Sequence, residues 1–412
     1  MIDIVRSSDE ERVDALLAPR RGDFRVVQRK VARIVEDVRR DGDDAVRRYA
    51  TELDALRGPI ELSSKEVAAR AKQAPAVVRK ALRLAARHIA RVAAAQVPRS
   101  FRLRVAAGIT VEQRVRPLDR VGCYIPAGRY PLPSTLLMTA VPARVAGVRD
   151  VIVVCPRPDA TVCAAAMQAR ISRVFQVGGA QAIAALAFGT ATVPRVDKIV
   201  GPGNKYVAAA KAAISAECAI DFHAGPTEIL IVSERGNPEW LAADLIAQAE
   251  HDPDARAVLL TSKLRLAHMV LAHIERQMPQ TGPARQALQQ NGAIVVTGSV
   301  QESLALANRM APEHLVVDDE EQGAAVACAG SIFIGPYSAQ VAGDYAIGAN
   351  HVLPTGGAAR FRGGLHASDF VRVVSVQRLT RRGLKAIGPT ATTLARAEGL
   401  DAHARSIEMR VR

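Results

Sequence analysis

The sequence predicts an α/β protein with two domains, each built on a parallel sheet that helices cover on both faces. The first observation is size, because 412 residues, of which 49% are hydrophobic, are many for a single core. The second is that short apolar runs alternate with helical segments between residues 105 and 228, as in "DVIVVCP", "RVFQVGG" and "DKIVGPG". The third is that this alternation restarts between residues 229 and 368, with "AVLLT", "AIVVT", "HLVVD" and "SIFIG". Such a rhythm is typical of parallel sheets buried on both faces.

The two ends of the chain have helical patterns. Within residues 1–104, apolar residues recur at three- and four-residue spacing, as in "VVQRKVARIVEDV", so this segment is predicted to be mainly helical. The alternating "GITVEQRV" then opens the first α/β domain, residues 105–228. Residues 229–368 form the second domain, and residues 369–412 are predicted to be a polar helical tail.

Composition argues against several classes of protein. No apolar run approaches the roughly 18 residues of a membrane span, and the charged N-terminus lacks the apolar segment of a signal peptide, so we expect a cytoplasmic protein. The five cysteines are scattered and never spaced as CxxC, which argues against a disulfide framework or a thiolate zinc site. The net charge of +14 could suit nucleic acid, but the arginines spread over amphipathic helices without interleaved aromatic residues. We therefore expect a solvated basic surface and no nucleic-acid partner.

Two glycine-containing loops separate a strand from a helix in the first domain, "QVGGAQAIAALAFGT" and "KIVGPGNKYVAAAK". Such loops can present backbone N–H groups and a positive helix end to phosphate. Neither matches the G-x-G-x-x-G fingerprint, and glycine is also needed in ordinary tight turns. Two consecutive loops of this kind favour a nucleotide.

Two motifs carry a Glu–His pair. In "QAEHDPDA", Gln248 and His251 are three residues apart on one helix face, so an amide oxygen and an imidazole could reach one cation. The alternative is an ordinary helix end. In "APEHL", Glu313 and His314 stand between a helix and a strand. They could be an acid–base pair that faces a cleft, and the alternative is a capped, exposed turn.

Further polar candidates lie near the C-terminus. In "GDYAIGANHVLPTGG", Asp344 is a candidate metal ligand and His351 a candidate base or substrate contact, among glycines that permit close backbone approach. Glu398 and His403 in "RAEGLDAHARS" stand in the polar tail, and chemistry alone gives them no role.

Taken in order, these motifs resemble those of the histidinol dehydrogenase family. The resemblance runs from about residue 100 to the end and rests on "GCYIPAGRYPLPST", "VGGAQAIAALAFGT", "DKIVGPGN", "AGPTEILI", "QAEHDPDA", "APEHL", "GDYAIGANHVLPT" and "EGLDAH". It implies two Rossmann-like, aldehyde-dehydrogenase-like α/β domains. It also implies zinc- and NAD-dependent oxidation of L-histidinol to L-histidine through histidinal, in two successive hydride transfers.

The resemblance assigns roles residue by residue. The residues that would bind one zinc ion per subunit are Gln248, His251, Asp344 and His403. The acid–base pair would be Glu313 and His314. The residues that would contact the substrate are Thr227, Gln248, His251, His314, Asp344, His351, Glu398 and His403. NAD would be bound by Tyr124, Gln181 and Asn204.

The resemblance also implies a homodimer whose C-terminal tail crosses to the partner subunit. Glu398 and His403 would then complete the partner's site, which gives the polar tail a reason to carry them. No cysteine falls at a position with an assigned role, so the chemistry would need no thiol nucleophile.

The chain departs from the family pattern at three positions. Thr227 stands where Ser is usual, and His223 and His366 are atypical. These departures leave open a paralogue that oxidises another small polar alcohol, amino or sulfonated, with the same zinc and NAD chemistry. A non-catalytic basic binding protein is a further alternative, although such a protein has no need of the candidate ligands and acid–base residues.

Overall fold

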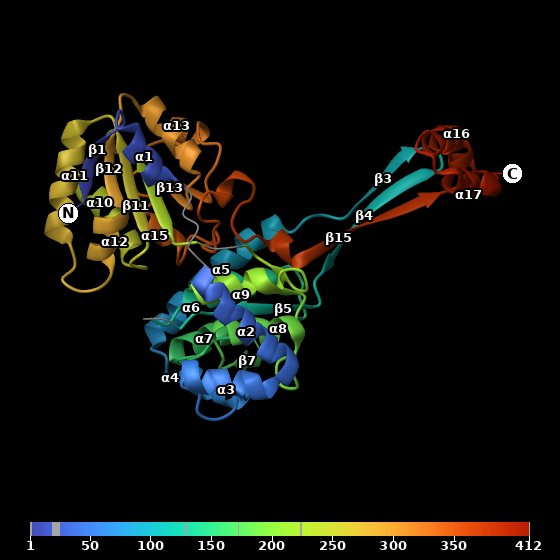
Figure 1. Ribbon diagram of the computed structural model, residues 1–412, viewed down its shortest axis with the longest axis horizontal. Coiled ribbons are helices and arrows are strands. Elements are labelled where there is room, and N and C mark those ends of the chain that lie inside the picture. Colours follow the sequence, from blue (N-terminus) through green and yellow to red (C-terminus); the bar gives the residue numbers. More distant parts are fainter. Residues whose placement is uncertain (1, 19–24, 128–129, 172, 223–224, 412) are drawn as a thin grey trace.

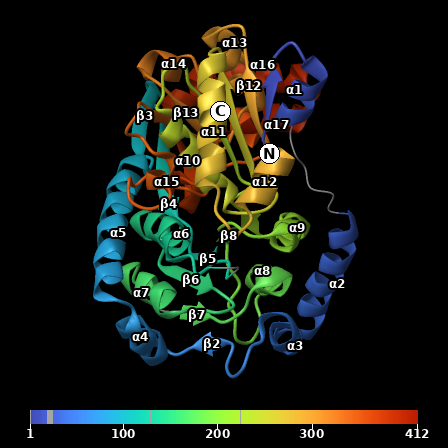
Figure 2. The same cartoon turned by 90° about the vertical axis from the view of Figure 1, so that its left-hand side faces the viewer.

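The computed structural model consists of two α/β bodies and one protruding arm (Figure 1). It describes residues 2–18, 25–127, 130–171, 173–222 and 225–411. The second body sits above the first in Figure 2, with α5 (Ala76–Gln96) along one side of the molecule. Within the described ranges, no helix combines the length and the apolar character that crossing a membrane requires.

The first body is built on a six-stranded sheet. Its strands, in spatial order, are β2 (Glu61–Leu62), β7 (Arg173–Phe175), β6 (Asp150–Val154), β5 (Arg120–Tyr124), β8 (Lys198–Val200) and β9 (Ala219–Ile220). Only β2 runs antiparallel to its neighbour. One face is covered by α4 (Ser64–Gln73), α5, α6 (Pro133–Val145) and α7 (Ala160–Gln168). The other is covered by α2 (Arg25–Asp41), α3 (Asp43–Asp54), α8 (Gly179–Phe188) and α9 (Lys205–Ile214).

The second body repeats this plan with an entirely parallel sheet. The strand order is β1 (Asp3–Arg6), β12 (Gly292–Val296), β11 (Arg256–Thr261), β10 (Glu228–Val232), β13 (His314–Val317) and β14 (Ser331–Ile334). On one face lie α10 (Pro238–Ala249), α11 (Leu264–Gln277) and α12 (Ala284–Asn291). On the other lie α1 (Glu10–Leu17) and α13 (Val300–Met310), while α14 (Glu320–Ala324) packs on β13 and β14. The predicted α/β class with two parallel sheets is therefore confirmed.

The arm is a three-stranded antiparallel sheet that extends away from both bodies (Figure 1). It consists of β3 (Phe101–Ala106), β4 (Ile109–Pro117) and β15 (Val371–Leu379), and its far end carries α16 (Arg381–Ala397) and α17 (Asp401–Val411). Every residue of β3 is exposed, and most of β15 is as well. The arm thus leaves both faces of its sheet largely uncovered by its own chain.

Two terminal segments contain a strand where helix was expected. Residues 1–104 contribute β1, which extends the edge of the second sheet by pairing with β12, and they also contain β2 and the start of β3. Their helices α2 to α5 cover the first sheet. The expected helical tail begins instead with β15, because nine residues from Val371 pair in register with β4. Both strands depend on a distant partner, which a local helical pattern does not reveal.

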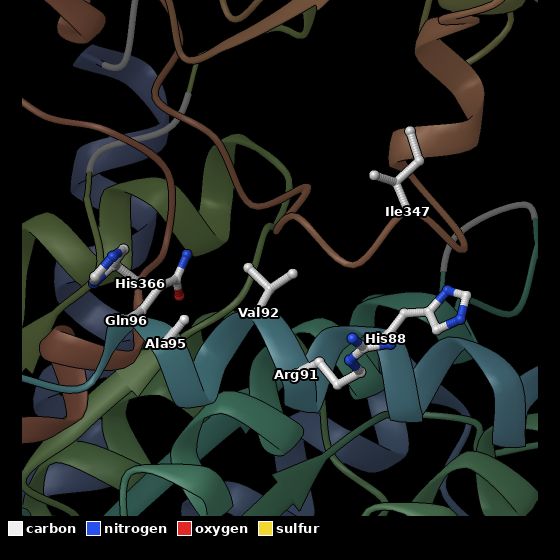
Figure 3. Close-up of a pocket in the computed structure, with 7 residues that line it drawn as sticks. All are labelled: His88, Arg91, Val92, Ala95, Gln96, Ile347 and His366. Carbon is white, nitrogen blue, oxygen red and sulfur yellow. The ribbon is translucent and has the colours of Figure 1, made fainter.

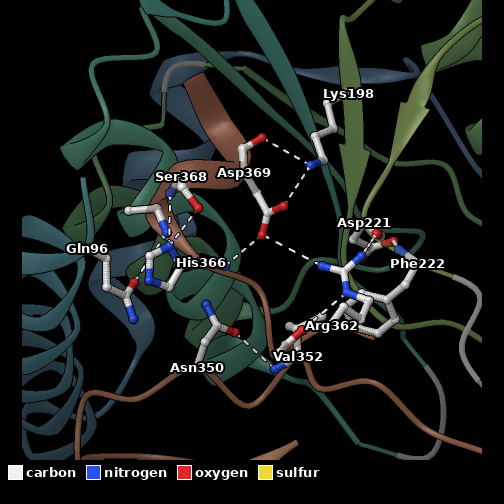
Figure 4. Close-up of polar contacts among 12 residues, drawn as sticks. Gln96, Lys198, Asp221, Phe222, Asn350, Val352, Arg362, His366, Ser368 and Asp369 are labelled. Carbon is white, nitrogen blue, oxygen red and sulfur yellow. Dashed lines mark hydrogen bonds and ion pairs between the residues drawn. The ribbon is translucent and has the colours of Figure 1, made fainter. Parts of the chain in front are cut away.

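A long irregular segment, residues 335–370, returns the chain from the second body to the first. It contains α15 (Gln340–Gly343) and two 3₁₀ turns, η1 (Ala358–Arg360) and η2 (Ala367–Phe370). Lys198 of β8 donates to the backbone oxygen of Asp369 at 3.0 Å and pairs with its carboxylate at 3.2 Å (Figure 4). Arg362 lies over the Phe222 ring at 4.4 Å and donates to the Asp221 carbonyl. These contacts fix the segment against the first sheet.

Candidate functional site

The predicted acid–base residues lie where the two bodies join. The chain passes from the end of β9 to the start of β10 in seven residues, so the carboxyl edge of the first sheet leads directly to the amino edge of the second. Thr227 precedes β10, Glu313 precedes β13, and Ile229 pairs with His314 between the two strands. Gln248 lies in the last turn of α10. Parallel pairing therefore brings three separate motifs to one edge.

A hydrogen-bond chain connects Gln248, Thr227 and Glu313. The Gln248 amide nitrogen donates to the Thr227 hydroxyl at 2.6 Å, and that hydroxyl donates to Glu313 Oε2, also at 2.6 Å. Glu313 Oε2 accepts a second bond from the Glu228 N–H at 2.9 Å. Gln248 is fully buried, and its Oε1 has no hydrogen-bond partner among the described residues. A buried oxygen without a partner is unusual and marks a place where a ligand fits.

Burial keeps the carboxyl groups at this edge partly protonated near neutral pH. It raises the pKa of Glu313 to about 8, against the hydrogen bonds from Thr227 and Glu228 that lower it. It raises the pKa of Glu228 to about 7, opposed by Arg256, whose Nη1 lies 3.9 Å from the carboxylate. Glu313 can therefore both take up and release a proton at physiological pH.

His314 is held as a neutral imidazole with one free nitrogen. Its Nδ1 lies 3.1 Å from the Glu228 carbonyl oxygen, which can only accept, so Nδ1 carries the hydrogen. Burial lowers the pKa of His314, which favours the neutral form. Nε2 then presents a lone pair, has no hydrogen-bond partner among the described residues, and lies 3.9 Å from Asp344 Oδ1. This is the geometry of a general base.

The loop after α15 brings Asp344 and His351 to the same place. Asp344 Oδ2 accepts from Gln340 at 3.1 Å, and burial raises the pKa of its carboxyl, opposed by the nearby imidazole groups of His314 and His251. His351 Nδ1 bonds to the Asp344 carbonyl at 2.9 Å, while its Nε2 lies 3.2 Å from the Thr135 hydroxyl. Burial lowers the pKa of His351 to about 4. His251 follows α10 with its side chain exposed.

The four predicted zinc ligands do not meet within one chain. Among the residues that the structure describes, no three His, Cys, Asp or Glu side chains are grouped as a metal site. One reason is chemical, since Gln248 supplies an amide. The other is spatial, because His403 lies in α17, at the far end of the arm (Figure 1). Glu398, a predicted substrate contact, follows α16 at the same end. Both tail residues are exposed.

The predicted NAD residues lie at the carboxyl edge of the first sheet. The Tyr124 hydroxyl accepts from the Gly179 N–H at 3.1 Å, and the buried Gln181 donates to Asp54 at 3.0 Å. Asn204 caps α9 by accepting from the Tyr206 and Val207 N–H groups. All three side chains therefore have structural contacts.

The glycine loops differ from the sequence expectation in one respect. The N–H groups of Gly178 and Gly201 are not free for phosphate, because Asp54 accepts from Gly178 at 2.9 Å and Asp221 accepts from Gly201 at 2.7 Å. Lys211 in turn pairs with Asp221 at 2.6 Å. The sequence did not predict the roles of Asp54, Lys211 and Asp221, because each lies outside the short loop to whose backbone it bonds. The one available signal is a charged residue within an otherwise apolar helix, as in "KYVAAAKAAI".

A cavity of about 720 Å³ opens beside the loop that carries Asp344 (Figure 3). Its lining includes His88 and Arg91 of α5, Ile347 and His366. His88 Nδ1 bonds to the Ala346 carbonyl at 2.7 Å, which ties α5 to this loop.

The atypical residues have different surroundings. Thr227 is part of the hydrogen-bond chain described above. His366 begins η2, where its Nδ1 accepts from the Ser368 N–H at 3.2 Å, so it serves as a helix cap (Figure 4). His223 lies outside the described residues.

Fold and site together define a two-body α/β protein in which a buried glutamate and a buried histidine, Glu313 and His314, lie where the two bodies join. The family model for histidinol dehydrogenase matches residues 18–411. Histidinol dehydrogenase of Brucella suis is 42% identical over 100% of both chains, and that of Methanothermobacter thermautotrophicus is 43% identical over 98% of both. The crystal structure of histidinol dehydrogenase from Elizabethkingia anophelis aligns with a TM-score of 0.93 at 33% identity, covering 100% of this chain and 98% of that one. The chain belongs to the histidinol dehydrogenase family.

Proposed function

We propose that this protein is a cytoplasmic enzyme of histidine biosynthesis, which oxidises L-histidinol to L-histidine with NAD and one zinc ion per subunit. The observation that carries the proposal is a connected set of buried groups with two partnerless atoms among the described residues, Gln248 Oε1 and His314 Nε2. Gln248 is linked through Thr227 to Glu313, Glu313 Oε2 lies 3.7 Å from His314 Nδ1, and His314 Nε2 lies 3.9 Å from Asp344. Family membership, with relatives about 42% identical over the full length, supports histidinol as the substrate.

The donor set fits zinc. Gln248 Oε1, His251 and Asp344 would supply oxygen and nitrogen ligands, which zinc accepts, and His403 of a partner's tail would be the fourth. When bound, zinc would supply a Lewis acid that fixes the substrate's amine and imidazole. Glutamine is an uncommon zinc ligand, but the oxygen of Gln248 has no other use among the described residues.

His314 would be the base for the alcohol. The Glu228 carbonyl holds the proton of His314 on Nδ1, so Nε2 can remove the hydroxyl proton while the adjacent carbon loses a hydride to NAD. The product of this first step would be histidinal, held in place for the second.

Glu313 would act in the second oxidation. In its ionised form the carboxylate can remove a proton from water as the water attacks the aldehyde carbon, which gives the anion of the hydrate. This anion would lose a hydride to a second NAD to give the carboxylic acid of histidine, which releases its remaining acidic proton to become the carboxylate. A pKa raised to about 8 makes Glu313 a stronger base than an exposed glutamate. Thr135, 3.2 Å from His351 Nε2, would orient that imidazole toward the substrate.

NAD would bind at the carboxyl edge of the first sheet, near Tyr124, Gln181 and Asn204. Because the N–H groups of Gly178 and Gly201 are bonded to carboxylates, we expect side chains to dominate its recognition. Gln181 Oε1, which is buried without a partner among the described residues, would become a contact after a small opening of this edge.

We propose further that two copies exchange their arms. Large apolar side chains are exposed on the arm and its helices, including Phe101, Leu103, Val373 and Leu394. A three-stranded sheet that is uncovered on both faces buries too little apolar surface to stand in water alone. A second copy would cover it, and Glu398 and His403 would reach the partner's site. The cavity lined by Ile347, which belongs to the loop that follows Asp344, would provide room for such a segment.

The experiment is to measure bound zinc, oligomeric state and NADH production with L-histidinol. We expect a dimer with one zinc per chain and two NADH per histidinol consumed. A panel of amino and sulfonated alcohols separates histidinol from the substrates of a paralogue. Turnover of a panel member without turnover of histidinol would assign the chain to that alternative, and salt-sensitive nucleic-acid binding without zinc would favour the binding protein.

A further inference from the structure

The Thr227 hydroxyl has only one hydrogen, and its neighbours determine where that hydrogen goes. Glu313 Oε2 lies 2.6 Å from Thr227 Oγ1 and accepts from the Glu228 N–H at 2.9 Å, so a proton taken up by this carboxyl goes to Oε1 and Oε2 remains an acceptor. The hydroxyl must therefore donate to Glu313 and can only accept from Gln248, 2.6 Å away. As a result, the amide nitrogen of Gln248 faces Thr227, and the amide oxygen faces the opposite way.

The reversed amide has no comparable arrangement. Turning Gln248 over would place its oxygen against the lone pairs of Thr227 Oγ1, and Gln248 is fully buried, away from bulk water. The N–H groups of the buried Gln248 amide would lose their acceptor, the Thr227 hydroxyl oxygen. The amide oxygen and that hydroxyl oxygen, both acceptors, would then face each other. Thr227 therefore selects one of two orientations that share nearly the same shape.

We propose that Thr227 is a positioning residue, which turns the carbonyl oxygen of Gln248 toward the zinc position and does so through its bond to Glu313. The inference rests on the proposed function, because it assigns to Gln248 the role of a zinc ligand. It also differs from the substrate contact implied by family resemblance. The hydrogen of Thr227 is already given to Glu313, so the hydroxyl has none to donate to a substrate.

The threonine methyl group supports the same role. Thr227 stands immediately before β10, and a β-branched side chain has fewer χ1 rotamers than serine. The hydroxyl is thereby held between its two partners. Serine at this position would keep both hydrogen bonds, although its side chain would be less restricted in χ1. Valine would keep the shape of threonine and lose both hydrogen bonds.

The test measures zinc affinity by competition with a chromophoric chelator, in the absence of substrate and NAD. Thr227→Val should weaken zinc binding by about 10–100-fold, the usual effect of losing a residue that orients a metal ligand. Thr227→Ser should stay within about threefold of the natural chain. Glu313→Gln should also retain zinc, because its amide oxygen can still accept from Thr227 and the Glu228 N–H.

A double variant distinguishes positioning from general damage. If Thr227 acts only through Gln248, then adding Thr227→Val to Gln248→Ala should weaken zinc binding no further. Additive losses would overturn the proposal. So would unchanged zinc affinity in Thr227→Val, or an equal loss in Thr227→Ser. Should Thr227→Val fail to fold, Thr227→Ala is measured instead against the same expectations. A natural chain that binds no zinc would overturn the proposed function itself, which is a separate result.

Discussion

Removing the charge of Lys211 should destabilise the first body. Lys211 Nζ lies 2.6 Å from Asp221, and the two side chains are 4% and 2% exposed. The same nitrogen donates to the Gly201 carbonyl at 2.6 Å, while Asp221 accepts from the Gly201 N–H at 2.7 Å. The ion pair therefore binds both polar backbone groups of the residue that follows β8.

The size of the effect follows from what remains after Lys211→Met. Breaking a buried pair costs about 3–5 kcal/mol, because the other charge stays behind without its partner. Asp221 keeps two backbone donors, Gly201 and Phe222, so we expect about 3 kcal/mol, the lower end of that range. For a unit of roughly 200 residues, an unfolding entropy of about 2.1 cal/mol/K per residue converts this into a fall of about 7 °C in the unfolding midpoint.

The assay is thermal unfolding followed by calorimetry. Arg40→Met is the matched control, since its pair with Asp41 is exposed and should contribute little. Adding Asp221→Asn to Lys211→Met removes the stranded charge and should recover part of the loss. A fall of less than about 2 °C in Lys211→Met, or no recovery in the double variant, would refute the reasoning.

Three further predictions concern other parts of the chain. Gly201→Ala should destabilise the protein, because φ is +116° and a Cβ would lie 2.2 Å from the Tyr124 carbonyl oxygen; Gly282→Ala, with φ +99° and open space, tests the backbone effect alone by the same melting assay. In metal-free protein, folding raises the pKa of Glu313 from 4.5 to about 8, so the folded state holds a proton that the unfolded chain releases. The stability of the natural chain relative to Glu313→Gln should therefore fall between about pH 4.5 and 8 and then level off, and a constant difference in melting midpoint would contradict this. Alkylation should label Cys328 and leave activity intact, because the other four cysteines are buried and burial raises the pKa of each thiol to about 11 or 12; mass spectrometry and an activity assay check both points.

Sequence periodicity was sufficient for the two parallel sheets because their strands are short, continuous apolar runs separated by helices. It was insufficient for β1 and β15, whose pairing partners lie far away in the chain. A four-residue strand at a sheet edge has almost no local signal. The same holds for the arm, because its shape depends on what β4 pairs with, and nothing in "GITVEQRV" specifies a sheet that protrudes from the body.

The site was predictable as a set of residues, but its internal connections were not. Motifs identified Glu313, His314 and Gln248, and the structure places all three at the amino edge of the second sheet. That Thr227 bonds to both Gln248 and Glu313 depends on side-chain geometry, which spacing does not contain. Asp54 is a similar case, since it reaches Gly178 across more than a hundred residues of sequence.

The arm also has a genetic consequence. If tails are exchanged, each catalytic centre is built from two chains, one of which supplies Glu313 and the other His403. Chains carrying Glu313→Gln and chains carrying His403→Ala would each be inactive alone. A mixed pair would contain one centre with both defects and one with neither, so co-expression of two dead alleles would restore growth without histidine. Two alleles that both alter the body, or two that both alter the tail, would show no such complementation.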